Sequence, residues 1–324
     1  MELPSQLVPI PGAAGLHAWM PYDSGGWGYA NCLWIVSGED AAVIDTPYDQ
    51  PLTDAMIRAA RPVLGSGRVS TVVNTHANGD HSWGNHLFPG ATVITTLSGF
   101  EHLGHEPTPE EMHRLLNETS PDGALGWYLR RHFGMFDFLS ARTPIPTQTF
   151  SGRHVFEVGG TEVELIEVGP AHHSGDLIAR VGDVVCAGDV FFPDDHPPHW
   201  SGPIQNIIDA NETILGLSPR VIIPGHGGLK GPHDLREHID YLGTLQREIR
   251  LRFEGGLKVR EAMDDIFRCD FFPQLRLPER LMIVIAVEYG HLQGETAGPS
   301  IIELASGAAQ WAFDRRTEPR VPVA

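Results

Sequence analysis

The sequence predicts an α/β fold in which two stacked β-sheets lie between outer layers of helices. Short apolar runs bounded by turn residues fill two strand-rich halves of the chain, and longer helix-like stretches lie between and after them. The chain has 324 residues, enough for one large domain or two ordinary ones. We assign residues 1–310 to a single domain and residues 311–324 to a polar tail.

The first half of the chain alternates strands and helices. The apolar runs Cys32–Val36 and Ala41–Asp45 are joined by a Ser-Gly-Glu-Asp turn, which indicates a β-hairpin. Residues 49–65 place apolar side chains at helical spacing and end in glycine, so we expect a helix there. Further strands are expected up to His76 and over Ala91–Thr96.

Residues 98–146 differ from the segments on either side. They are rich in glutamate and histidine, and helix-like stretches run over Glu110–Leu116 and Leu125–Phe138. We expect a helical insertion that acts as a lid, because long insertions between strands commonly carry function. Its aromatic stripe includes Tyr128 and Phe133, which are candidate contacts for an apolar or aromatic substrate, although the same spacing suits a packed core.

The second half returns to strands and then becomes helical. Glycine-containing turns at 159–160 and 182–183 predict two hairpins, and the apolar run at 220–226 predicts a buried strand. Helices are expected over Asn211–Leu217, from His233 to about Ile266 and from Pro278 to about His291. We assign residues 233–310 to the C-terminal helices.

Composition limits the partners of this protein. The 41 acidic side chains outnumber the 23 basic ones, and the net charge of −18 disfavours nucleic acid and anionic membranes as partners. No apolar run is long enough for a membrane span, and the N-terminus lacks the features of a signal peptide. The three cysteines form no CxxC motif, which is typical of a reducing compartment. We expect a cytoplasmic protein that acts on a small molecule, with self-association left open.

The densest group of polar side chains follows the strand that ends at His76. The segment His-Ala-Asn-Gly-Asp-His offers two imidazoles, an amide and a carboxylate in a short stretch. Imidazole and carboxylate suit zinc and related divalent ions, although histidine and asparagine are also common in loops. The candidate metal ligands in this segment are His76, Asn78, Asp80 and His81.

Three later segments repeat this arrangement. His172 and His173 follow a strand and a Gly-Pro turn. Asp189 follows an apolar strand and a glycine, and His226 lies between two glycines after a buried strand. Glycine lets the backbone approach a shared centre closely. Four strand ends that carry ligand-type side chains together predict a binuclear metal site.

The order of these segments resembles that of the metallo-β-lactamase-fold hydrolases. The family pattern is HxHxDH, then a histidine, a bridging aspartate and a final histidine, and this chain has THANGDH, GPAHHSGD, AGD and PGHG in that order. The resemblance runs from about Gly15 to Leu229, and GGWGYANCLWIV…VIDTP is similar to the N-terminal hairpin of the cyclase-like or glyoxalase II-like bacterial branch. It implies a four-layer αββα sandwich with metals at the sheet edge.

The resemblance also implies how two divalent ions, expected to be zinc, are held. The ligands would be His76, His172 and Asp189 for the first ion, and Asp80, His81, His226 and the bridging Asp189 for the second.

Asn78 departs from the family pattern, since it stands where the middle histidine of HxHxDH is expected. A neutral amide oxygen is a poorer zinc ligand than imidazole, so the first site should bind metal more weakly. Three consequences are open: a single ion at the second site, a water in place of the missing ligand, or a harder ion such as manganese or iron. We favour two ions with a weakened first site.

A centre of this kind predicts hydrolysis. A bound divalent ion lowers the pKa of its water from roughly 15.7 towards about 7 and polarises a carbonyl. The resemblance implies that Asp80 orients this water or accepts its proton, and His173 is a candidate for stabilising the oxyanion. We expect metal-bound hydroxide to cleave an ester, thioester, lactone or amide-type bond in a small organic substrate. The alternative is an iron-dependent oxygenase or other redox enzyme on the same fold, favoured by the oxygen donor of Asn78.

A loop close to the predicted centre supplies further candidates. The segment Phe191–Trp200 follows Asp189 almost directly and contains His196, His199 and Trp200. We predict that these three side chains contact substrate, and a proline-stiffened surface turn is the alternative interpretation.

Overall fold

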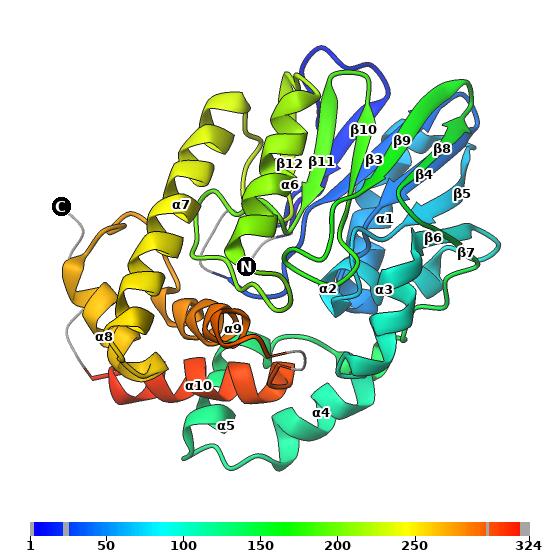
Figure 1. The fold of residues 1–324 in the computed structure, drawn as a ribbon. Helices are drawn as coiled ribbons and strands as arrows, with labels where there is room; N and C mark the ends of the chain where they lie inside the picture. The colour runs from blue at the N-terminus through cyan, green and yellow to red at the C-terminus, as the bar shows by residue number, and fades with distance from the viewer. Residues whose placement is uncertain (1–2, 22–25, 296–297, 318–324) are drawn as a thin grey trace.

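Two β-sheets pack face to face between helices in the computed structural model, which describes residues 3–21, 26–295 and 298–317 (Figure 1). The strand order is β1-β2-β3-β4-β5-β6-β7 in one sheet and β12-β11-β10-β9-β8 in the other. The first sheet comprises β1 (Val8–Pro9), β2 (Leu16–Trp19), β3 (Cys32–Ser37), β4 (Asp40–Ile44), β5 (Arg68–Val73), β6 (Thr92–Thr96) and β7 (Gln148–Phe150). The second comprises β8 (Arg153–Val158), β9 (Thr161–Glu167), β10 (Leu177–Val181), β11 (Val184–Gly188) and β12 (Val221–Pro224). The predicted αββα sandwich is confirmed.

Helices cover the outer faces of both sheets, and several gather at one end of the sandwich (Figure 1). The α-helices are α1 (Gln50–Leu64), α2 (Gly79–Ser82), α3 (Leu97–His102), α4 (Pro109–Glu118), α5 (Ala124–Phe133), α6 (Ile204–Gly216), α7 (Pro232–Glu254), α8 (Val259–Cys269), α9 (Leu281–Gln293) and α10 (Ile301–Asp314). Short 3₁₀ turns are η1 (Asn85–Leu87), η2 (Leu103–His105), η3 (Phe138–Ser140) and η4 (Pro278–Arg280). Within the described residues, no helix is long and apolar enough to cross a membrane.

Alternation along the strands sorts apolar side chains between separate layers of the core. On β3, Leu33 and Ile35 pack between the two sheets, whereas Trp34 packs in the cluster that contains α1. On β11, Cys186 faces the other sheet and Val185 faces the cluster that contains α6 and α7. Because successive strand residues point to opposite faces, each sheet is buried on both sides.

The parallel strands bring several loops to one edge of the sandwich. Strands β4, β5 and β6 run parallel to one another, and β12 runs parallel to β11. Helix α1 makes the first crossover; the Asp49 carboxylate caps it by accepting a hydrogen bond from the Leu52 amide, and it ends at Gly65, where φ is +58°. Contacts of Asp189 with His76 and with His226 show that the loops after β5, β11 and β12 meet at this edge.

Some element boundaries differ from those expected. Strand β5 ends at Val73, before His76, because the backbone amide of Thr75 already bonds to the Asp45 side chain. Helix α5 ends at Phe133 and does not reach Phe138.

The C-terminal region differs as well. Helix α6 begins seven residues before the predicted start at Asn211, and residues 255–258 separate α7 from α8. Helix α10 was not expected as a separate element; it forms because Leu304, Ala308 and Trp311 are buried along one face. Residues 311–314 are consequently helical and not part of a tail, while 318–324 lie outside the described residues.

Candidate metal centre

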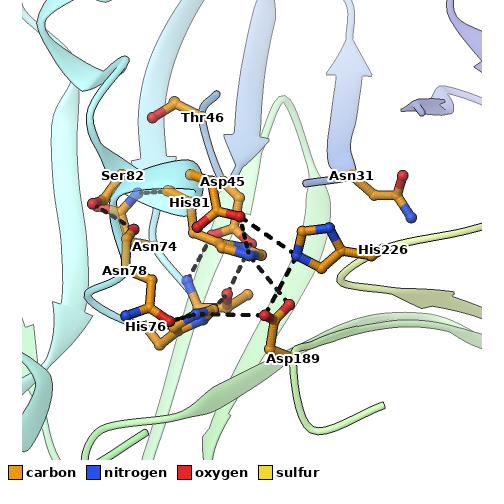
Figure 2. Close-up of polar contacts among 12 residues, drawn as sticks. Asn31, Asp45, Thr46, Asn74, His76, Asn78, His81, Ser82, Asp189 and His226 are labelled. Carbon is orange, nitrogen blue, oxygen red and sulfur yellow. Dashed lines mark hydrogen bonds and ion pairs between the residues drawn. The ribbon is translucent and has the colours of Figure 1, made fainter. Parts of the chain in front are cut away.

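Six side chains of metal-ligand type converge at the edge of the sandwich where β5, β9, β11 and β12 end. Figure 2 shows His76 and His81 facing Asp189 and His226 across a short gap. The six are His76, Asp80, His81, His172, Asp189 and His226. The structure therefore brings together all six histidine and aspartate ligands that the resemblance implied.

Close backbone packing holds the loops of this centre. A β-carbon at Gly225 would lie 1.8 Å from Asp189 Oδ1, so only glycine leaves room for that carboxylate. At the start of β3, Asn31 donates hydrogen bonds to the carbonyls of Pro224 and Gly227, each over 2.9 Å. These bonds clamp the loop that carries His226.

The ligand atoms of the second predicted site are spaced as they would be around a tetrahedral divalent cation. Nε2 of His81 lies 3.1 Å from Asp189 Oδ1, and Nε2 of His226 lies 3.4 Å from Asp189 Oδ2 and 3.5 Å from Asp80 Oδ2. Tetrahedral ligands bound at usual zinc distances lie roughly 3.4 Å apart. His81 Nε2 and Asp189 Oδ1 are buried without a hydrogen-bond partner among the described residues. The donor set therefore fits a divalent cation.

The first predicted site is built around Asn78. Its Oδ1 lies 3.1 Å from Nε2 of His76 and 3.1 Å from Nε2 of His172. Asp189 Oδ2 is 3.5 Å from His172 Nε2 and 3.9 Å from His76 Nε2. Two imidazoles, a carboxylate and an amide oxygen thus surround one point, and Asp189 faces both sites.

Burial and neighbouring charges set the pKa values of the imidazoles at this centre. Burial lowers the pKa of His172 to about 3, and burial together with the His81 charge lowers the pKa of His76, which leaves both rings neutral as ligands require. Burial also acts to lower the pKa of His81, but surrounding carboxylates, Asp189 most strongly, outweigh it and raise that pKa. Such an excess of negative charge around one ring favours a bound cation.

Asp45 supports the centre from behind, and the sequence analysis did not select it. Its Oδ2 lies 2.8 Å from His81 Nδ1, and it accepts hydrogen bonds from the backbone and side chain of Thr75, each over 2.7 Å. A carboxylate on the far nitrogen of a ligating histidine fixes the tautomer and orientation of the ring. Its place at the end of an apolar strand, like that of Asp189, was the available signal.

Glu106, on the insertion, joins the centre through Asn78 and His173. It accepts a hydrogen bond from Asn78 Nδ2 over 2.8 Å, and its Oε1 lies 2.7 Å from His173 Nε2. The ring of His102 lies 4.6 Å from that of His173, centroid to centroid. Nothing in the sequence pattern near Glu106 distinguishes it from the other glutamates of the insertion.

The position of His173 corrects one expectation. Its ring is fully buried against Glu106 and does not line the cavity beside the centre, so it is not placed to stabilise an oxyanion there. The ring is held there by the contact of its Nε2 with Glu106 Oε1, and the backbone amide of His173 donates a hydrogen bond to Asp176 Oδ2 over 2.7 Å.

The other predicted substrate contacts divide into two groups. Trp200, Tyr128 and Phe133 line the cavity that opens at the metal centre. His196 and His199 are buried and are not among the described lining residues. His196 Nδ1 lies 2.9 Å from the Tyr241 hydroxyl on α7, so this ring packs against a helix.

A known protein family matches the part of the chain that carries these ligand-type side chains. Residues 25–226 match the family model described as the metallo-beta-lactamase superfamily. The chain belongs to the metallo-β-lactamase superfamily. The predicted family identification is confirmed. No match was found among curated proteins.

Two solved structures are similar to this chain in fold. The stereoselective inverting sec-alkylsulfatase Pisa1 from Pseudomonas sp. is similar with a TM-score of 0.68 and 14% identity over 90% of this chain and 50% of that protein. This chain therefore spans half the length of the alkylsulfatase. The metallo-beta-lactamase from Pontibacter korlensis is similar with a TM-score of 0.52 and 15% identity, over 74% of this chain and 99% of that protein.

Proposed function

We propose that this protein is a metal-dependent hydrolase that uses two zinc ions to cleave an ester, thioester, lactone or amide-type bond in a small organic substrate. The observation that carries the proposal is the convergence of four imidazoles and two carboxylates at the end of a cavity, with Asp189 facing both sites. When bound, divalent ions supply Lewis-acid polarisation and a water acidic enough to attack at neutral pH.

The side chains of the centre have two roles, metal binding and proton transfer. Asp80, His81, His226 and Asp189 would hold the second ion, and Asp189 would also reach the first. Asp80 lines the cavity and its side chain is 16% exposed, whereas that of Asp189 is 5% exposed. Asp80 is therefore the carboxylate that can reach a water in the cavity, orient it and accept its proton.

Metal identity is the first test. We expect protein purified without added metal to contain zinc, with the second site full and the first partly filled, measured by inductively coupled plasma mass spectrometry. The oxygen of Asn78 also suits a harder ion. Stoichiometric iron with a visible charge-transfer band would support the redox alternative and overturn the zinc hydrolase.

Turnover is the second test. A panel of chromogenic esters, thioesters, lactones and β-lactams, extended by sulfate esters because of the likeness to the alkylsulfatase, should contain hydrolysed members. Asp80→Ala should abolish that turnover, and Asp122→Ala, an exposed carboxylate, should leave it unchanged. Equal rates for Asp80→Ala and the wild type would overturn the assigned role of Asp80.

We also propose a cytoplasmic location and a small molecule as the partner of the cavity. The three cysteines support a reducing compartment, since Cys32 and Cys186 are buried free thiols and Cys269 is an exposed one. Self-association is testable by light scattering on the purified protein.

A further inference from the structure

We propose that the cavity beside the metal centre is specific for small organic anions, and that Arg280 binds their negative group. The inference rests on the proposed function only in taking the bond that reacts to lie at the metals. It deepens that function by naming the chemical class of the substrate.

The cavity is apolar except at two places. Its walls are formed by aromatic and aliphatic side chains of the N-terminal loop, the end of α2, the insertion, the loop after β11 and α10. Among them are Trp27, Trp83, Leu129, Phe133, Trp200 and Ile301. It encloses about 100 Å³, comparable with the roughly 150 Å³ cavities that hold one benzene. A compact apolar group the size of an aromatic ring or a short branched chain fits there.

One polar place is the metal centre, and the other is Arg280. Among the described lining residues, Arg280 is the one with a positively charged side chain. It lies at the junction of η4 and α9, is 2% exposed, and its guanidinium carbon lies 4.0 Å from the centroid of the Trp27 ring. It donates hydrogen bonds to the carbonyls of Gly26 over 2.9 Å and His196 over 3.3 Å, while its Nε is buried without a partner.

This buried charge lacks an ion-pair partner among the described residues. Asp195, Glu279 and Asp189 act on Arg280 electrostatically and favour its charged form, with Asp195 the strongest of the three. Burial raises the pKa of Glu279, whose Oε1 instead accepts a hydrogen bond from the Tyr128 hydroxyl. An arginine keeps its charge when buried, and these acidic groups offset that charge without bonding to the guanidinium, so an anion that bonds to it directly stabilises it further.

The arginine is separated from the metals by one aromatic ring. Its guanidinium carbon lies 5.6 Å from the centroid of Phe192, and the Phe192 ring stacks on the predicted metal ligand His226 at 5.2 Å. A molecule bound by both therefore carries an anionic group on one side and its reacting bond on the other. Carboxylate and sulfate both match the planar fork of arginine.

Calorimetric titration of the zinc-loaded protein with benzoate and benzamide tests the inference, because the two probes have the same shape and differ in charge. We expect benzoate to bind at least about tenfold more tightly than benzamide. Arg280→Met should weaken benzoate binding about tenfold and change benzamide binding less than twofold, while Arg236→Met, an exposed residue on α7, should change neither. Unchanged benzoate affinity in Arg280→Met, or no benzoate binding to the wild type, would overturn the inference.

Arg280→Lys provides a second test in case Arg280→Met fails to fold. It keeps the charge and loses the fork, so we expect a benzoate affinity between those of the wild type and Arg280→Met. Wild-type affinity in Arg280→Lys would contradict bidentate binding. The ester panel separates the two hypotheses. Benzoate binding that depends on Arg280, without turnover of any ester, would contradict the proposed hydrolase function and leave the anion site standing. Turnover of neutral and anionic esters at equal kcat/KM would contradict anion specificity.

Discussion

Asn78 donates a hydrogen bond from its side-chain amide to Glu106 Oε2 over 2.8 Å. With Nδ2 held in this way, Oδ1 faces His76 and His172, 3.1 Å from Nε2 of each ring. Asn78 therefore presents an oxygen donor to the first metal site, and a glutamate of the insertion sets its orientation. Glu106 links the insertion to the metal centre.

Replacing Glu106 with glutamine should weaken zinc binding at the first site about tenfold, because a neutral amide holds Asn78 Nδ2 less firmly and no longer pairs with His173. The second site should keep its affinity. Competition with a chromogenic chelator measures both constants, and Glu110→Gln, exposed on α4, is the control. Equal affinities for Glu106→Gln and the wild type would show that Glu106 does not position Asn78.

Asn78→His should raise the zinc content of the first site and tighten its binding about tenfold or more, since imidazole is the better zinc ligand. Zinc per chain at fixed free zinc provides the measurement. Gln293→His, exposed at the end of α9, adds a histidine away from the centre and should leave the content unchanged. Unchanged stoichiometry and affinity in Asn78→His would place Asn78 outside the first site.

Gly225→Ala should remove zinc from the protein, because the added β-carbon would lie 1.8 Å from Asp189 Oδ1 and displace the carboxylate shared by both sites. Gly228→Ala is a matched control three residues on, where an added β-carbon meets nothing within 4 Å. The measurement is the zinc content of each variant after gel filtration, and Gly228→Ala should keep the wild-type content. Full zinc occupancy in Gly225→Ala would contradict the packing described for this loop.

Asp45→Asn should lower zinc affinity at the second site by about 10- to 100-fold, since an amide cannot replace the carboxylate behind His81. Stability of the metal-free protein should fall little, because burial raises the pKa of Asp45 and makes its charge costly in the absence of metal. Thermal melts with and without zinc, compared with exposed Asp240→Asn, measure both effects. A similar loss of stability in both metal states would assign Asp45 a structural role alone.

The layers and the ligand-bearing loops were predictable because their signals are local. Alternation of apolar residues along β3 and β11 is a property of neighbouring positions, as is the placement of Asp189 and His226 directly after apolar strands. Helix α10 was missed because its small and apolar residues become a helix face only when they pack with other helices.

The sequence by itself determined which residue types stand at each strand end, and hence a metal centre on an αββα sandwich. Only the tertiary structure decided that Glu106 holds Asn78, that His173 turns away from the cavity, and that Arg280 lies within it. The physical reason is the distance along the chain. Glu106 is 28 residues from Asn78, and Arg280 is 254 residues from the Gly26 carbonyl it contacts. Contacts between residues so far apart in the sequence depend on how whole helices and strands pack together, and a local sequence pattern does not predict that packing.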